Sequence, residues 1–353
     1  MPNLVEILKQ AVADNVSDVH ISVASPVIYR KNGALLSVSE EILKPQDTEE
    51  MIFSMLRESQ QKTLEELGEL DFAYSIAGVA RFRVNAFRQR GTYAAAIRVV
   101  VSTPPDARDI GLSDEIISLA DKRSGLVLVT GPTGSGKSTT LAALIDYINT
   151  HKSHNVITVE DPIEYLHKNK KSIISQREIG SDTLSYANAL RAALRQDPDV
   201  ILIGEMRDHE TISVALTAAE TGHLVFSTVH TVGAAKTIDR VTDIFEPFQQ
   251  QQIRVQLSTV LRGVISQQLL PKADGTGRVA AFEIMFDTPA ISNNIREAKT
   301  FQINNAIQTN RAMGMVSMDA YLSELVKKGL VTFETALSYA VDSEQFSRLA
   351  NNL

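Results

Sequence analysis

The chain has 353 residues, a length that predicts two or three domains. Hydrophobic residues make up 44% and charged residues 22%, as in an ordinary globular protein. The formal net charge of −7 disfavours broad binding to nucleic acid, which requires a basic face, so we expect no nucleic-acid partner. The absence of cysteine excludes disulfides, a thiol nucleophile and cysteine-based zinc sites. Without an apolar run of ~18 residues or the pattern of a signal peptide, we expect a cytoplasmic protein.

The first hundred residues have the pattern of a small α+β domain. A short amphipathic helix is predicted near residues 5–13 and a polar, helix-rich stretch at 46–67. Segments with the alternation of strands occur at residues 19–22, 27–30, 35–38 (after a turn at Asn32-Gly33), 72–76, 80–89 and 93–100. We therefore predict an N-terminal α+β domain over residues 1–101.

Two adjacent prolines mark the clearest boundary in the chain. They lie in Ser102-Thr103-Pro104-Pro105-Asp106 and cannot continue a helix or a central strand. We predict a linker over residues 102–113.

Beyond the linker, short apolar runs alternate with helical patterns. The apolar runs cover residues 126–130, 156–159, 200–203 and 224–228, and the helical patterns cover 137–149, 184–195 and 208–220. Continuous apolar strands separated by helices predict a parallel sheet covered on both faces, so we assign an α/β domain to residues 114–290. Residues 291–353 form a helical C-terminal region, with helices expected at 318–328 and 333–340.

A phosphate-binding loop follows the first of these strands. The segment Gly131–Ser138 fits G-x-x-x-x-G-K-[ST], with the strand before it and the helix after it that this loop requires. Glycines allow backbone N–H groups to surround a phosphate at a helix N-terminus. Lys137 would pair with the β- and γ-phosphates and Ser138 would ligate Mg²⁺, which predicts ATP and Mg²⁺ as ligands. The predicted nucleotide-binding residues are Gly131, Pro132, Thr133, Gly134, Ser135, Gly136, Lys137, Ser138 and Thr139.

Acidic residues follow two of the other apolar strands. Glu205 follows Gly204 after the strand at 200–203 and is the candidate to hold Mg²⁺, directly or through water. Glu160, Asp161 and Glu164 follow the strand at 156–159. We favour Glu164 as general base, and the sequence leaves its two neighbours open as alternatives.

Two histidines bracket the strand at 224–228. His230 ends a strand predicted to lie beside the phosphate-binding loop, so it could contact the γ-phosphate side and report hydrolysis. His223 precedes the same strand, and we place both histidines in the candidate site.

Five arginines gather on the last strands of the N-terminal domain: Arg81, Arg83, Arg88, Arg90 and Arg98. They could form a solvated basic edge that discourages strand aggregation. Alternatively, some of them are arginine fingers that neutralise charge on a nucleotide at a domain or subunit boundary.

These motifs together resemble the PilT/PilU group of secretion-type ATPases, the retraction motors of type IV pili. The resemblance runs over nearly the whole chain. It is carried by Ser17-Asp18-Val19-His20, by the Gly131–Ser138 loop, and by segments similar to the Asp box (156–167), the atypical Walker B (195–208) and the His box (221–231).

The resemblance implies a PAS-like N-terminal domain, a RecA-like ATPase domain and a homo-hexameric ring that closes its two domains on ATP. It also implies a motor that retracts a pilus at the inner face of the cell membrane, acting on an inner-membrane platform protein, with a second retraction ATPase as a further partner. The positions that match the family's catalytic residues are Arg83, Arg98, Glu164, Glu205, His223 and His230.

One family motif is altered. Retraction motors similar to this chain carry Ala-Ile-Arg-Asn-Leu-Ile-Arg, whereas residues 290–296 read Ala-Ile-Ser-Asn-Asn-Ile-Arg. An assembly or secretion ATPase and a PilU-like accessory motor therefore stay open as alternatives. A binding module whose partner affinity is set by bound nucleotide, with negligible turnover, also stays open.

Overall fold

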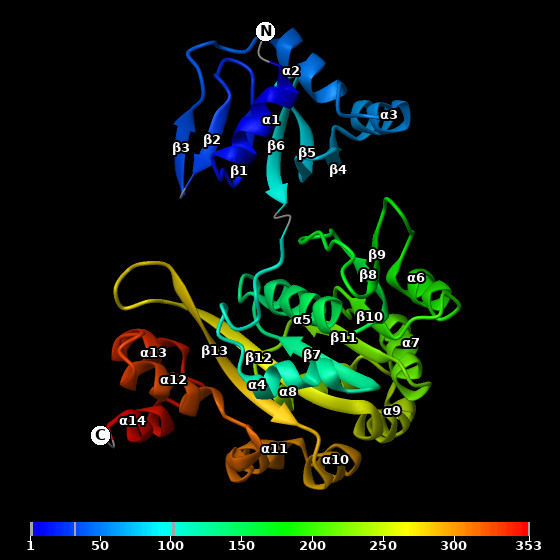
Figure 1. Cartoon of the computed structure of the whole chain (residues 1–353), viewed down its shortest axis with the longest axis vertical. Helices are drawn as coiled ribbons and strands as arrows, with labels where there is room; N and C mark the ends of the chain where they lie inside the picture. Colours follow the sequence, from blue (N-terminus) through cyan, green and yellow to red (C-terminus); the bar gives the residue numbers. More distant parts are fainter. Residues whose placement is uncertain (1–2, 32, 101–102, 352–353) are drawn as a thin grey trace. The chain divides into compact units, whose positions relative to one another are not determined.

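The computed structural model describes residues 3–31, 33–100 and 103–351. The chain forms two compact units, Met1–Thr103 with Glu164–Leu166, and Pro104–Ile163 with His167–Leu353 (Figure 1). The predicted boundary between residues 101 and 102, and Asn32 of the predicted turn, lie outside the described residues.

The first unit is built on a six-stranded antiparallel sheet in the order β3-β2-β1-β6-β5-β4. Its strands are β1 (Asp18–Ile21), β2 (Ile28–Lys31), β3 (Ala34–Ser37), β4 (Glu69–Ile76), β5 (Ala80–Gln89) and β6 (Thr92–Val100). Its helices are α1 (Leu4–Ala13), α2 (Pro45–Phe53) and α3 (Glu58–Leu67). These elements follow the predicted segments closely. In β5, Phe82 and Val84 are fully buried while Arg83 is exposed, so one face of the sheet forms a core and the other presents polar groups.

The second unit is built on a seven-stranded sheet in the order β13-β12-β7-β11-β10-β8-β9. Its strands are β7 (Gly125–Thr130), β8 (Asn155–Glu160), β9 (Ile173–Glu178), β10 (Val200–Ile203), β11 (Leu224–Val229), β12 (Leu261–Pro271) and β13 (Arg278–Phe286). Its helices before the C-terminal region are α4 (Asp114–Ile117), α5 (Lys137–His151), α6 (Tyr186–Ala193), α7 (His209–Glu220), α8 (Ala234–Asp243) and α9 (Pro247–Val260).

The predicted parallel sheet needs one correction. All its neighbouring strands run parallel except β12 and β13, which pair antiparallel, so β13 is an antiparallel edge strand. A loop of residues 272–277 between β12 and β13, rather than a crossover helix, produces this edge.

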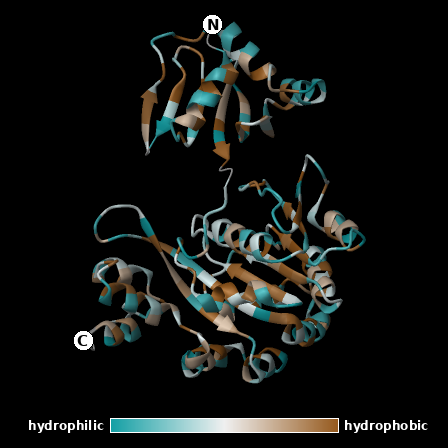
Figure 2. Cartoon of the chain, viewed as in Figure 1, coloured by the Kyte–Doolittle hydropathy of each residue, from teal (hydrophilic) through white to brown (hydrophobic). Residues whose placement is uncertain are grey.

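Hydrophobic cores lie on both faces of this sheet. Along β7, Leu126 and Leu128 belong to the core cluster under α7, α8 and α9, whereas Val127 and Val129 belong to the cluster under α5. Figure 2 shows the central strands as predominantly hydrophobic ribbons. Burial on both faces explains why these strands read as continuous apolar runs in the sequence.

Residues at both ends of the predicted ATPase domain pack into its cores. Ala107 and Leu112, in the predicted linker, are buried in the core cluster under α5. The predicted boundary at 290/291 falls inside α10 (Pro289–Arg296), whose Ile291 and Ile295 pack in the same cluster as Leu126. The region that follows contains α11 (Ile303–Thr309), α12 (Met318–Lys327), α13 (Phe333–Tyr339) and α14 (Ser343–Asn351). Across the described part of the chain, no helix is both long and apolar enough to cross a bilayer.

Candidate functional site

The loop between β7 and α5 adopts a backbone that requires glycine. Gly131, Gly134 and Gly136 have φ values of 144°, 79° and 90°, in the region that side chains rarely adopt. A Cβ at Gly131 would lie 2.2 Å from the carbonyl oxygen of Gln267, so glycine is also needed there for a close approach. The loop leads directly into α5, which begins at Lys137. Its N-terminal N–H groups therefore face the turn, as anion binding requires.

Lys137 holds its ammonium group against this loop. Its Nζ donates to the carbonyl oxygens of Gly131 at 3.0 Å and Pro132 at 2.9 Å. The residue is only 8% exposed. A lysine confined in this way keeps its positive charge beside the backbone N–H groups of the loop, where a phosphate would need it.

The loop also contains polar atoms that suit a nucleotide ligand. The hydroxyl oxygens of Ser135 in the loop and of Thr130 at the end of β7 are buried and lack a hydrogen-bond partner among the described residues. Such groups call for a ligand or an ordered water. The described residues contain no cluster of three or more metal-ligating side chains. Mg²⁺ usually takes one or two protein ligands and completes its shell with phosphates and water, so the loop fits Mg²⁺ with a nucleotide.

Glu205 and His230 meet at the carboxyl edge of the sheet. They follow the neighbouring parallel strands β10 and β11, and His230 Nε2 lies 3.3 Å from Glu205 Oε2. Glu205 Oε1 also pairs with Arg207 Nε at 2.6 Å. The side chain of Glu205 is 13% exposed, so its carboxylate is largely enclosed. The structure thus brings the side chains of Glu205 and His230 together at this edge.

Tyr186, at the start of α6, is a residue that the sequence analysis missed. A Cβ on Gly204 would lie 2.9 Å from its hydroxyl oxygen, which fixes the hydroxyl beside the turn that carries Glu205. Burial raises the pKa of Tyr186, and the charges of Glu205, Asp161 and Glu160 raise it further. Its neutral hydroxyl therefore lies among three carboxylates. No local motif marks a tyrosine 19 residues from Glu205, and only the fold brings the two together.

The three acids after β8 have different surroundings. Glu160 Oε1 accepts hydrogen bonds from Thr158 Oγ1 at 2.6 Å and Gln176 Nε2 at 3.1 Å. The backbone N–H of Ile163 donates to Glu178 Oε2 at 3.0 Å, which anchors the following segment. Glu164 is exposed, and within the described residues its carboxylate makes no ion pair. Asp161 and Glu164 are both exposed, whereas Glu160 is half-buried and held by Thr158 and Gln176.

The structure separates His223 from His230. His223 precedes β11 and His230 follows it, so the six-residue strand holds them roughly 20 Å apart. His223 Nδ1 lies 2.9 Å from the carbonyl oxygen of Ala218, near the end of α7. Within this chain, His230 therefore lies with Glu205 at the carboxyl edge of the sheet and His223 lies at the opposite edge, and the part of both histidines in the site stays a prediction.

In the first unit, Arg83 and Arg98 lie directly opposite each other on β5 and β6. Both are exposed, and Arg98 Nε bonds Asp18 Oδ1 at 2.8 Å. Like charges placed opposite each other in a sheet cost stability, and Asp18 offsets part of that cost. Paired, exposed guanidinium groups are suited to bind an anion.

The family follows from comparison with known proteins. The sequence profile described as Type II/IV secretion system protein matches residues 1–330. The chain belongs to this family. It is 48% identical over 344 residues to the type IV pilus retraction ATPase PilT of Pseudomonas aeruginosa, covering 98% of this chain and 100% of that protein. It is 37% identical over 344 residues to the type IV pilus ATPase PilU of the same organism, covering 98% and 90%. A crystal structure of the pilus retraction motor PilT with bound ADP matches with a TM-score of 0.93 and 48% identity, covering 99% of this chain and 100% of that one.

These matches confirm the predicted resemblance to the PilT/PilU group and the predicted fold class, an α/β RecA-like P-loop domain with an N-terminal domain and a helical C-terminal region. This member of the secretion family is an ATPase that binds nucleotide.

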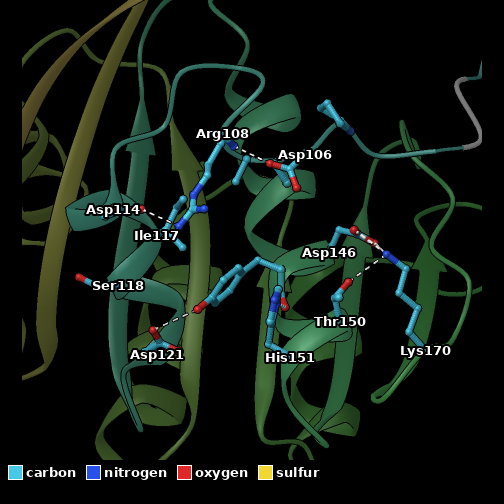
Figure 3. Close-up of a pocket in the computed structure, with 14 residues that line it drawn as sticks. Asp106, Arg108, Asp114, Ile117, Ser118, Asp121, Asp146, Thr150, His151 and Lys170 are labelled. Atoms are coloured by element: carbon cyan, nitrogen blue, oxygen red, sulfur yellow. Dashed lines mark hydrogen bonds and ion pairs between the residues drawn. The ribbon is translucent and has the colours of Figure 1, made fainter.

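A separate cavity of about 510 Å³ flanks α5 in the same unit (Figure 3). Arg108 bonds Asp114 on one side of it, and Lys170 bonds Asp146 and Thr150 on the other. No residue predicted to take part in catalysis or nucleotide binding lines this cavity. Its arginine and its lysine are therefore each paired with a carboxylate that also lines the cavity.

Proposed function

We propose that this ATPase powers the retraction of type IV pili by hydrolysing ATP at the carboxyl edge of its β7–β11 sheet. The observation that carries the proposal is the convergence of the Gly131–Lys137 loop, Glu205 and His230 at strand ends of one sheet. Open α/β sheets bind their ligands at this edge. The similarity to PilT over nearly its whole length supports retraction as the mechanical output.

Each loop residue has a distinct part in binding. The N–H groups of residues 133–139 would surround the β-phosphate, and Lys137 would move from the loop carbonyls to the phosphate oxygens. Ser138 and Glu205 would hold Mg²⁺, Glu205 directly or through water. When bound, Mg²⁺ neutralises phosphate charge as the terminal phosphoryl group leaves.

The remaining groups act on the attacking water and on the developing charge. Glu164, whose carboxylate is exposed, would accept a proton from the attacking water. His230, held beside Glu205, would contact the γ-phosphate side and sense hydrolysis. Arg83 and Arg98 would neutralise negative charge on the phosphates, with Asp18 orienting Arg98. His223 would support the site indirectly, through its contact with α7.

The proposed working form is a homo-hexamer whose N-terminal and ATPase domains close around Mg-ATP. We place it in the cytoplasm at the inner face of the cell membrane, acting on the platform protein of the pilus. A second retraction ATPase is a candidate partner, as the relative named PilU suggests.

Deletion of the gene tests the mechanical output. We expect a strain that carries more surface pili than its parent and has lost twitching motility, because extension continues without retraction. We also expect that a Lys137→Ala allele does not restore motility to the deletion strain. Loss of surface pili in the deletion strain would instead assign the chain to assembly and contradict retraction.

A further inference from the structure

Strand β12 passes directly behind the phosphate-binding loop. Gln267, in the middle of this strand, is 3% exposed. Its backbone carbonyl oxygen lies 2.2 Å from the position that a Cβ on Gly131 would take, and its side-chain Nε2 lies 2.8 Å from the corresponding position on Gly136. One residue therefore contacts the first and the last glycine of the loop.

The carboxamide of Gln267 also holds the first turn of α5. The hydroxyl of Thr140 donates to Gln267 Oε1 at 2.7 Å, and Thr140 is fully buried. With Oε1 engaged by Thr140, the amide nitrogen of the same group is turned toward Gly136. Thr140 follows Lys137 by three residues, about one helical turn, so the contact fixes the turn that presents the lysine.

We propose that Gln267 is a positioning residue for nucleotide binding, which locks the phosphate-binding loop against the start of α5. Glycine-rich backbone loses much conformational freedom when it is ordered around a ligand. A buried side chain that holds both ends of the loop lowers that cost before the ligand arrives. The inference rests on the proposed nucleotide site at residues 131–139.

The neighbours of Gln267 on β12 provide an internal comparison. Side chains alternate along a strand, so Ser266 and Gln268 point to the other face. Ser266 Oγ accepts from the N–H of Gly233 at 2.9 Å, and Gln268 Nε2 donates to the carbonyl oxygen of Tyr339 at 3.2 Å. Gln268 is 9% exposed and has the same chemistry as Gln267, which makes it a matched control.

The affinity of the full chain for ADP, measured by titration calorimetry, tests the proposal. We expect Gln267→Ala and Thr140→Val each to raise Kd about five- to tenfold, as the loss of one buried hydrogen bond predicts. Thr140→Ser keeps the hydroxyl and should keep the wild-type Kd. Gln268→Ala should lower Tm and leave Kd unchanged. The double variant Gln267→Ala/Thr140→Val should lose no more than the stronger single variant, because both remove the same contact.

Gln267→Glu gives a readout that a purely structural residue would not. The substitution keeps an acceptor for Thr140 and places a buried carboxylate beside the phosphates, where burial raises its pKa. At pH 8 we expect a larger loss of ADP affinity than for Gln267→Ala. Lowering the pH to 6 should restore affinity toward that of the wild-type protein at the same pH.

The outcomes separate the inference from the function on which it rests. Suppose that Lys137→Ala abolishes ADP binding, and that Gln267→Ala binds ADP as the wild type does although its Tm is as low as that of Gln268→Ala. The positioning role is then refuted and the nucleotide site stands. If Lys137→Ala leaves ADP binding unchanged, the proposed site itself is wrong.

Discussion

At the scale of single residues, chemistry and location must be judged together. Glu205 and His230 follow adjacent parallel strands, and because such strands end at one edge, their side chains meet there. The sequence alone does not distinguish His230 from His223, which precedes the same strand at its opposite end. It missed Gln267 and Tyr186, since Gln267 meets Thr140 across 127 residues of sequence and no local pattern encodes that contact.

The two histidines should therefore respond differently to substitution. We expect His230→Ala to lower kcat for ATP hydrolysis by roughly 10²-fold, the scale of one catalytic side chain in proton transfer or charge stabilisation. We expect His223→Ala to lower Tm through loss of its contact with α7 and to reduce kcat much less. Steady-state assays on both variants check this, and an equal loss of kcat would contradict the separation of the two sites.

His167 makes the stability of the fold depend on pH. Burial lowers its pKa to about 4. The charge of Asp146 opposes this shift, and the charge of Lys170 adds to it. Its Nδ1 is buried without a partner among the described residues, so the ring is neutral in the fold. In the unfolded chain, His167 has a pKa near 6.5, above its folded value. Its contribution to the free energy of unfolding is therefore complete above pH 6.5 and is lost as the pH falls toward 4.

We expect His167→Gln to flatten this dependence. The wild-type free energy of unfolding should fall by about 2 kcal/mol more than that of the variant between pH 7 and pH 5. Urea denaturation of both proteins at the two pH values measures the difference. Parallel pH profiles would show that His167 is not held neutral.

At the scale of elements, the strands of the sheet divide into those the sequence reveals and those it hides. β7, β10 and β11 are buried on both faces and read as apolar runs. β12 is hidden because it carries the polar run Ser266-Gln267-Gln268 at its centre, although all three residues are buried. Buried polar residues that form hydrogen bonds to other elements cannot be distinguished from surface residues by sequence alone.

Glu283 on β13 shows what such residues do for the fold. It is 6% exposed, and its Oε1 accepts from the N–H of Ala234 at 2.7 Å at the start of α8. Its Oε2 lies 3.5 Å from the N–H of Met318 at the start of α12. Although burial raises its pKa, these backbone donors favour the ionised carboxylate. One side chain thus satisfies the first N–H groups of two helices.

We expect Glu283→Ala to destabilise the second unit by about 2 kcal/mol, because both helix ends lose their acceptor. A unit of this size would then melt roughly 4–8 °C lower. Glu283→Gln keeps one acceptor oxygen and should show a smaller shift. Differential scanning calorimetry measures both, and an unchanged Tm for Glu283→Ala would contradict the capping role.

At the scale of the whole molecule, the ordered motifs predicted the fold class well because each motif reports a particular strand end. The match to the ADP-bound PilT structure over 99% of the chain agrees with that reading. Arg83 and Arg98 lie opposite each other on β5 and β6 and Glu164 is exposed, and their part in the site stays a prediction. The sequence could not foresee the antiparallel edge β13 or the extension of the core into α10, since both depend on long-range packing.

A crystal structure with Mg²⁺ and a non-hydrolysable ATP analogue tests the central claim most directly. We predict that the β-phosphate lies against the N–H groups of residues 133–139 with Lys137 turned onto it, and that Glu205 is within reach of the metal or its waters. Arg83, Arg98 and Glu164 should approach the γ-phosphate. Phosphates bound away from this loop, or a loop still closed on Lys137 beside a bound analogue, would contradict the account.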